Sequence, residues 1–341
     1  TAVSVLKIGG EMIFITPRSF TSGNYFRLFR EKFFKLAKPE FIHLFDSRKD
    51  AFKKDSVLQE NIILKAKRLD NWQTDLAKHS IVISSCGGIN DIELATKTEM
   101  PLMDVIDLNT DNKVLKIPNI RKGENIFVKF GSFRGTLEEY GLKISTGPVV
   151  AFRAEKFFTE ENAKQENIVP LLWLHNIKAM KVSWPLYKRG KQQHIKNTSE
   201  SLPLLIRNSN YVLLRRFSAK EEPRRLIASP FIGRLYPYDS IGLENHINYI
   251  HRPKWGLKEE EAWGLAVLYN SSYYDNYFRD VNGSTQVSAT EINSIPLPPL
   301  DVIVEIGKMA MSNAVSLGDI DSLADIAFNE SANTEGILVN V

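Results

Sequence analysis

The stretch VLKIGGEMIFITPRSF, residues 5–20, decides the fold class of this chain. It reads as a helix end, a Gly9-Gly10 turn, and a strand from Met12 to Thr16 that Pro17 stops. A short apolar run between turn signals predicts a buried strand. This order of elements is typical of the interior of an α/β domain, so we expect the domain to include sequence that precedes Thr1.

The next residues add to the same predicted sheet. The apolar positions of residues 25–36 fall mostly on one helix face, and Pro39 is expected to end that helix. Short apolar runs predict strands at residues 41–45, 61–66 and 81–85. One helix and four strands are part of an α/β sheet and not a whole one, because the buried strands would keep an open edge.

The predicted secondary structure changes after Gly88 to short strands with few helices. Four short runs predict strands, at residues 125–130, 147–152, 168–174 and 211–217. Helices are expected over residues 257–280 and 301–328, and Ser288 with Glu291 forms a capping box. We therefore predict α/β plus α+β architecture in three parts: a partial Rossmann-like sheet (1–88), an irregular β-rich domain (89–300) and a helical C-terminal tail (301–341).

Composition places the chain among ordinary globular proteins, with 341 residues, 43% hydrophobic and 25% charged. No apolar run reaches the roughly 18 residues of a membrane helix, so no membrane partner is expected. Cys86 is the only cysteine, which excludes an internal disulfide and favours a cytoplasmic location. The six histidines are scattered, and no metal site is predicted.

The charge is distributed unevenly. Residues 171–234 contain 13 Lys or Arg, three Glu and no Asp, whereas residues 301–341 contain one Lys and seven acids. A basic block in the middle of the chain predicts a polyanionic partner, and the alternative is a solvated basic surface.

Five segments carry a resemblance to a known family. They are LKIGGEMIFITPRSFTSGNYFRLFREKFF, FIHLFDSRKDAFKKDSVLQENIILK, ISTGPVVAFRA, LENHINYIHRP and VNGSTQVSATEINSIPLPPL. In this order they resemble the adenine-specific (N6) DNA methyltransferases of type II restriction–modification systems, of the PstI and BsuBI type. The resemblance implies a Rossmann-like domain that binds S-adenosylmethionine and a flipped adenine, followed by a domain that recognises double-stranded DNA.

Two motifs that the resemblance implies are missing. The family's Gly-rich cofactor loop has no counterpart at Gly9-Gly10 or Gly87-Gly88, and no Asn-Pro-Pro sequence occurs. The chain therefore resembles the C-terminal portion of such a methylase. We expect S-adenosylmethionine to serve the intact enzyme and not to bind this chain alone, and we predict no catalytic residue within it.

Site residues are suggested by the resemblance, by the position of Arg18 after a strand and by the charge of residues 215–225, for which the alternative is a solvated loop. Gln59 and Asn61 are candidates for the flipped-base pocket, or else polar residues of an edge strand. Arg18 is a candidate phosphate contact, or else a surface salt bridge. In the basic block, His175 and Asn176 are predicted to read bases, whereas clustered cations position the backbone. The full set of DNA-binding candidates is Arg18, His175, Asn176, Lys178, Lys181, Arg215, Arg216, Lys220, Arg224, Arg225, Thr285 and Gln286.

Two other functions stay open. The chain could be a stand-alone DNA-binding specificity subunit whose partner chain carries the missing motifs. It could also be an RNA-binding module, although aromatic residues are not interleaved with the basic block as stacking platforms require. The reading frame upstream of Thr1 separates a methylase portion from a subunit, because only the first would encode the missing motifs in the same frame.

Overall fold

The computed structural model describes residues 2–45, 60–106, 108, 110, 112–118, 120, 125–159, 167–219, 221–282, 286–312, 316 and 318–338. The chain divides into two compact units. Unit 1 comprises Thr1–Lys129 with Arg279–Ser284, and unit 2 comprises Phe130–Phe278 with Thr285–Val341. The predicted boundaries at residues 88 and 300 differ from this division, and as limits of functional domains they stay predictions.

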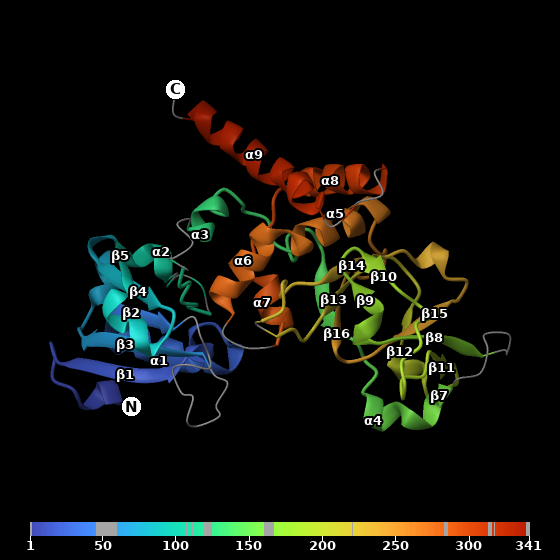
Figure 1. The fold of residues 1–341 in the computed structure, drawn as a ribbon, viewed down its shortest axis with the longest axis horizontal. Helices are drawn as coiled ribbons and strands as arrows, with labels where there is room; N and C mark the ends of the chain where they lie inside the picture. Colours follow the sequence, from blue (N-terminus) through green and yellow to red (C-terminus); the bar gives the residue numbers. More distant parts are fainter. Residues whose placement is uncertain are drawn as a thin grey trace. The chain divides into compact units, whose positions relative to one another are not determined.

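Unit 1 is built on one mixed five-stranded sheet, in the order β1-β3-β2-β4-β5 (Figure 1). Only β2 and β4 are parallel, and the other three neighbouring pairs are antiparallel. The strands are β1 (Glu11–Pro17), β2 (Ala37–Phe45), β3 (Asn61–Arg68), β4 (Ser80–Cys86) and β5 (Thr96–Pro101). The α-helices are α1 (Arg27–Leu36), α2 (Leu102–Val105) and α3 (Ile126–Lys129), and short 3-10 turns are η1 (Ala2–Val5), η2 (Arg18–Thr21), η3 (Asn24–Phe26), η5 (Trp72–Lys78) and η6 (Ile89–Leu94).

The four predicted strands and the predicted helix of unit 1 are confirmed, but β1, which was predicted to be buried, is mostly exposed because it lies at an edge of the sheet. Helix α1 buries Phe33 and Phe34 against the apolar faces of β2 and β3. We expected Pro39 to end this helix. Helix α1 instead ends at Leu36, and Pro39 lies within β2 beside a bulge. A mixed α/β fold with several sheets is thus confirmed, while a Rossmann-like arrangement stays a prediction.

The described residues of unit 2 form three sheets, ordered β12-β15-β8-β11-β7, β14-β13-β16-β6 and β10-β9. Their strands are β6 (Lys143–Thr146), β7 (Phe158–Thr159), β8 (Ile168–Leu172), β9 (Ile177–Lys178), β10 (Lys181–Val182), β11 (His194–Lys196), β12 (Leu205–Arg207), β13 (Tyr211–Arg215), β14 (Ala228–Phe231), β15 (Ser240–Leu243) and β16 (Ile247–His251). The α-helices are α4 (Ala151–Ala154), α5 (Glu259–Asn270), α6 (Ser272–Val281), α7 (Ala289–Asn293), α8 (Leu300–Ser312) and α9 (Ile320–Leu338), and the 3-10 turns are η8 (Glu155–Phe157), η9 (Leu174–Asn176), η10 (Leu202–Leu204) and η11 (Gly233–Leu235).

Two of the strands predicted after Gly88 are wrong, one in unit 1 and one in unit 2. Residues 126–129 form helix α3, and residues 147–150 are irregular before α4 begins. Short apolar runs fit a buried helix turn as well as a strand, so periodicity could not separate the two. The strands at 168–174 and 211–217, the helices near the C-terminus and the Ser288–Glu291 capping box are confirmed.

Helix α5 joins the β-sheet part of unit 2 to its C-terminal helices. It packs against β13 and β14 on one side and against α8 on the other (Figure 1). Gly264 on α5 and Gly307 on α8 let the two backbones come close, because a Cβ on either glycine would overlap a carbonyl oxygen of the opposite helix. Among the described residues, no helix has the length and apolar character needed to cross a membrane.

Candidate functional site

A small hairpin, β9–β10, presents lysines from a buried base. Its strands pair Ile177 with Val182 and Lys178 with Lys181. Ile177 is buried and both lysines are exposed. The Met180 N–H donates to the Ala228 carbonyl at 2.9 Å, which holds the hairpin against β14. The apolar residues therefore anchor this element, and its two cations face outward side by side.

A second tight turn also pairs two lysines, of which Lys188 is exposed and Lys191 is half-buried with its Nζ 4.1 Å from the Trp173 ring centroid. Lys188 and Lys191 form an isolated antiparallel bridge, and the Lys191 N–H donates to the Lys188 carbonyl at 3.0 Å. Gly190 has a φ of +71°, which the turn requires, and Arg189 beside it is exposed. The neighbouring Tyr187 ring is 83% exposed. We call Lys178, Lys181, Lys188, Arg189 and Lys191 the basic patch.

His175 shows that the two turns lie together. Its imidazole Nε2 is 3.2 Å from the Leu186 carbonyl oxygen. Partial burial lowers its pKa, and the positive charges of Lys188, Lys191 and Lys178 lower it further. Lysines from both turns therefore surround one histidine, which favours the neutral imidazole.

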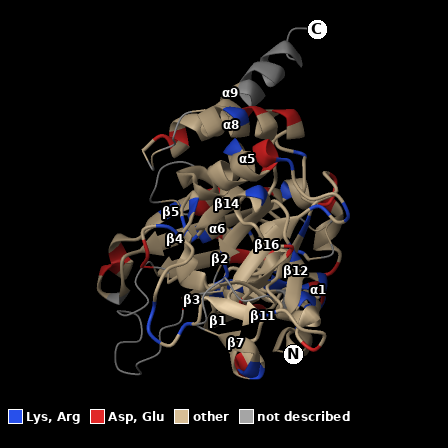
Figure 2. Ribbon diagram, turned by 90° about the vertical axis from the view of Figure 1, so that its right-hand side faces the viewer, with Lys and Arg blue, Asp and Glu red and all other residues tan. Residues whose placement is uncertain are grey.

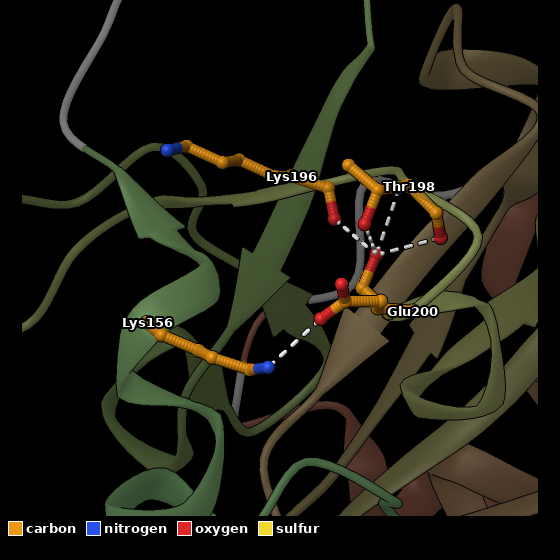
Figure 3. Close-up of polar contacts among 5 residues, drawn as sticks. Lys156, Lys196, Thr198 and Glu200 are labelled. Atoms are coloured by element: carbon orange, nitrogen blue, oxygen red, sulfur yellow. Dashed lines mark hydrogen bonds and ion pairs between the residues drawn. The ribbon is translucent and has the colours of Figure 1, made fainter.

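No acid of the local sequence offsets the basic patch, since residues 167–199 contain neither Asp nor Glu. The first acid that follows, Glu200, pairs with Lys156 at 2.8 Å, as Figure 3 shows. In the same view the Lys196 side chain points away from that pair, while its carbonyl accepts from Ser201. None of the four lysines of the basic patch forms an ion pair with a described residue.

Like charges directly opposite each other on paired strands are destabilising. The patch contains two such pairs, Lys178–Lys181 and Lys188–Lys191. An anion lying across both turns would relieve this repulsion. The arrangement is chemically suited to hold a chain of phosphates, with Arg189 and Tyr187 available for further contacts.

Asn176 does not lie where a base-reading residue must be. It is completely buried, and its Oδ1 accepts from the Trp173 N–H while its Nδ2 donates to the Ser183 carbonyl, both at 2.7 Å. The side chain therefore closes the turn that leads into the hairpin. This placement contradicts the predicted base contact, while Lys178 and Lys181 are exposed as a DNA contact requires.

We expect Asn176→Ala to lower the free energy of unfolding by about 2–3 kcal/mol, because it leaves a buried N–H and a buried C=O without partners. Chemical denaturation measures this loss. Binding of folded protein to specific and scrambled duplexes should fall equally. A selective loss on one duplex, with unchanged stability, would restore the base-reading role.

The arginine cluster is largely structural. The Arg215 Nε donates to the Ile177 carbonyl at 2.8 Å, and burial lowers the pKa of this guanidinium. Arg216 Nη1 donates to the Asn245 carbonyl at 3.0 Å, and Gln286, with its amide oxygen turned toward Arg216, accepts from Nη2 at 2.7 Å. Arg215 and Arg216 were predicted to contact DNA phosphates. Their guanidinium groups instead reach carbonyl groups of distant segments of the chain.

The other DNA-binding candidates of residues 215–286 divide into three groups. Arg225 is 1% exposed and its Nε donates to Ser218 Oγ at 3.0 Å, so it cannot reach a phosphate in this conformation. Arg224 is half-buried. Lys220 and Thr285 lie outside the described residues.

The candidates in unit 1 have different surroundings. Arg18 is buried, and its Nη1 is 3.3 Å from Glu60 Oε2. Arg18 therefore forms a salt bridge, as our alternative stated, but inside unit 1 and not on its surface. Asn61 is half-buried and pairs with Pro17. Its strand, β3, has partners on both sides and is not the edge strand of our alternative. Gln59 lies outside the described residues, and the pocket assignment stays a prediction.

Sequence reasoning missed Tyr187, Lys188, Arg189 and Lys191 as individual site residues. The signal was present in PLYKRGK, residues 185–191, where a glycine turn interrupts a run of cations. What the sequence did not show was that this turn lies beside the β9–β10 hairpin.

The two units define a mixed α/β protein with several sheets and a strongly basic surface element. No family model matches the chain. It is 35% identical over 323 residues to the type II methyltransferase M.PstI of Providencia stuartii, and the match covers 94% of this chain and 61% of that protein. It is 34% identical over 334 residues to the type II methyltransferase M.BsuBI of Bacillus subtilis, and the match covers 97% of this chain and 64% of that protein.

The chain is therefore homologous to the PstI/BsuBI-type methyltransferases over nearly its whole length, which confirms the resemblance, and it spans less than two-thirds of each relative. Among solved structures, the type IIL restriction–modification enzyme MmeI in complex with DNA covers 95% of this chain and 46% of its own, with 13% identity and a TM-score of 0.48. At that score the fold description rests on the sheets of this chain itself.

Proposed function

We propose that this chain is the DNA target-recognition portion, with the last strands of the catalytic domain, of a site-specific adenine-N6 DNA methyltransferase that uses S-adenosylmethionine. The basic patch, with its two opposed lysine pairs, carries this proposal. Homology to two type II methyltransferases supports the enzyme class. The binding partner is the phosphate backbone of duplex DNA, which supplies most of the affinity and makes it salt-dependent.

The glycine pairs of the chain do not fit the cofactor. The Gly87 and Gly88 N–H groups donate to the two oxygens of Asp91 at 2.9 and 2.7 Å, so their amides are already used. Gly9-Gly10 forms a tight turn in which a Cβ on Gly10 would lie 2.8 Å from the Lys7 carbonyl oxygen. We infer that this chain alone does not methylate DNA, and that the missing motifs come from another part of the methylase or from a partner chain. Calorimetric titration with S-adenosylmethionine tests this, since a saturable micromolar site would contradict it.

The experiment on DNA uses Arg189→Gln, because Arg189 is exposed and forms no hydrogen bond or ion pair with a described residue. We expect affinity for all duplexes to fall alike, and the slope of log affinity against log salt to decrease by about one unit. Titrations between roughly 50 and 200 mM salt measure that slope.

Lys308→Gln is the matched control. Lys308 is exposed and is the single cation of α8. The same helix carries two acids, and acids are red in Figure 2. It removes the same charge outside the basic patch and should leave the slope unchanged. Equal effects of both variants would show that net charge, and not the patch, governs binding.

A further inference from the structure

Tyr187 is an exposed aromatic side chain within a cationic segment. It is 83% exposed, and its side chain forms no ring contact or hydrogen bond with a described residue. Leu186, directly before it, is 37% exposed, and Lys188 and Arg189 follow it. The basic patch is therefore joined to an apolar tip of two neighbouring residues, which the binding of phosphates does not by itself require.

The backbone directly before Tyr187 is fixed by two hydrogen bonds. The Leu186 N–H donates to Gln193 Oε1 at 2.9 Å, and the Leu186 carbonyl oxygen lies 3.2 Å from His175 Nε2. Gln193 also donates from Nε2 to the Lys191 carbonyl at 3.0 Å, so one side chain joins the two arms of the turn. The tip is thus held in place without a bound partner, and binding has few further groups to order.

Two indole rings support the second arm of the same turn. Trp184 Nε1 donates to the Gln193 carbonyl at 2.9 Å, and Trp173 Nε1 donates to the Gln192 carbonyl at 2.5 Å. Trp173 is buried, so the turn of residues 184–193 is anchored on the interior of unit 2.

The charge around the tip distinguishes it from other exposed aromatic residues of unit 2. Trp255 and Phe152 are 86% and 76% exposed, but Glu259 and Glu155 follow them closely in the sequence. Residues 167–199, which include the tip, contain no acid. An aromatic ring among cations without acids suits a partner that combines phosphates with flat aromatic rings, as a nucleic acid does.

We propose that Tyr187 is a wedge, which inserts between two adjacent base pairs of duplex DNA held by the basic patch and kinks the duplex there. Apolar side chains that insert in this way partly unstack one base step and kink DNA by roughly 20–90°. This proposal rests on the proposed function and adds to it a distortion of the duplex that unit 2 produces.

Three features of the turn suit this role. The tyrosine ring can stack on the face of a base, which offsets the unstacking of the step. Lys188 and Arg189 lie next to the ring in the sequence and can hold the phosphates beside the kinked step. The fixed backbone at Leu186 resists displacement of the ring by the base pairs as they restack.

Fluorescence energy transfer between dyes at the two ends of a duplex of about 25 base pairs tests the wedge. At saturating protein we expect the ends to approach as a kink of roughly 20° or more requires. Tyr187→Ala should abolish this approach, and Tyr187→Phe should keep it, because the ring and not the hydroxyl inserts. Tyr25→Ala is the matched control, since Tyr25 is 92% exposed and lies in unit 1. Equal thermal melting confirms that each variant is folded.

Arg189→Gln separates the wedge from the phosphate contacts. It should lower the salt slope and keep the kink at saturating protein. Tyr187→Ala should do the reverse, because it removes no charge and so leaves the salt slope unchanged. A kink of undiminished size with Tyr187→Ala would show that cations alone curve the duplex, and it overturns the proposal.

The sequence of the duplex supplies a second readout. Pyrimidine–purine steps such as TA kink easily, whereas A-tracts are stiff. We expect the unmodified chain to bind a duplex with several TA steps about threefold or more tightly than an A-tract duplex of equal length, and Tyr187→Ala to bind both alike. The same preference in both proteins would contradict the wedge.

Failure of the wedge and failure of the proposed function give different results. Salt-dependent binding to a duplex that stays straight overturns the wedge and leaves the proposed function in place. Absence of salt-dependent duplex binding contradicts the proposed function itself, and the wedge with it.

Discussion

Gly264→Ala is expected to lower the free energy of unfolding of the protein by about 3 kcal/mol or more. In an ordinary helix this change would stabilise by about 0.5–1 kcal/mol, because glycine loses more backbone entropy. Here the new Cβ would overlap the Ile303 carbonyl oxygen on α8. A backbone atom in a packed helix cannot move separately, so α5 and α8 must separate and expose apolar residues of both.

Gly307→Ala should have an effect of the same size, because its Cβ would overlap the Glu260 carbonyl oxygen on α5. Gly318→Ala is the matched control, since its closest neighbour, Ser316 Oγ, lies 3.5 Å away. Urea denaturation of the three variants measures the difference. If Gly264→Ala and Gly318→Ala had equal stability, the close crossing of α5 and α8 would be wrong.

Arg225→Ala has the second large expected effect, a loss of about 2–4 kcal/mol in the free energy of unfolding. Its guanidinium is buried, donates to Ser218 Oγ and lies over the Phe278 ring, with 5.4 Å from Cζ to the centroid. Removing it leaves a cavity and an unpaired hydroxyl. The salt slope of duplex binding should stay unchanged, unlike the slope of Arg189→Gln.

Denaturation and salt titration on the same Arg225→Ala preparation separate the two roles. A variant that melts as the unmodified protein does, with a slope lower by about one unit, would show that Arg225 contacts phosphate and that its buried position is incorrect. The backbone N–H of Arg225 donates to Asp275 Oδ1 at 2.5 Å in either case, because alanine keeps this group.

The elements that could be predicted are those whose signals lie close together in the sequence. The apolar face of α1 and the Ser288–Glu291 capping box each involve residues a few positions apart. Short apolar runs at 125–130 and 147–152 lack such a signal, and there the predicted strands were wrong. Sequence analysis proposed Lys178 and Lys181 of the basic patch as DNA contacts, which stays a prediction, and it did not propose Lys188, Arg189 and Lys191.

The sequence by itself determined the α/β character of unit 1, the methyltransferase resemblance and the excess of cations in residues 171–234, because composition and local pattern carry all three. Only the tertiary structure decided which cations face solvent. Arg215, Arg216 and Arg225 find partners on distant segments, whereas Lys178 and Lys181 are exposed opposite each other in the β9–β10 hairpin. Burial of a charged side chain depends on groups brought together by folding, and a local pattern does not contain that information.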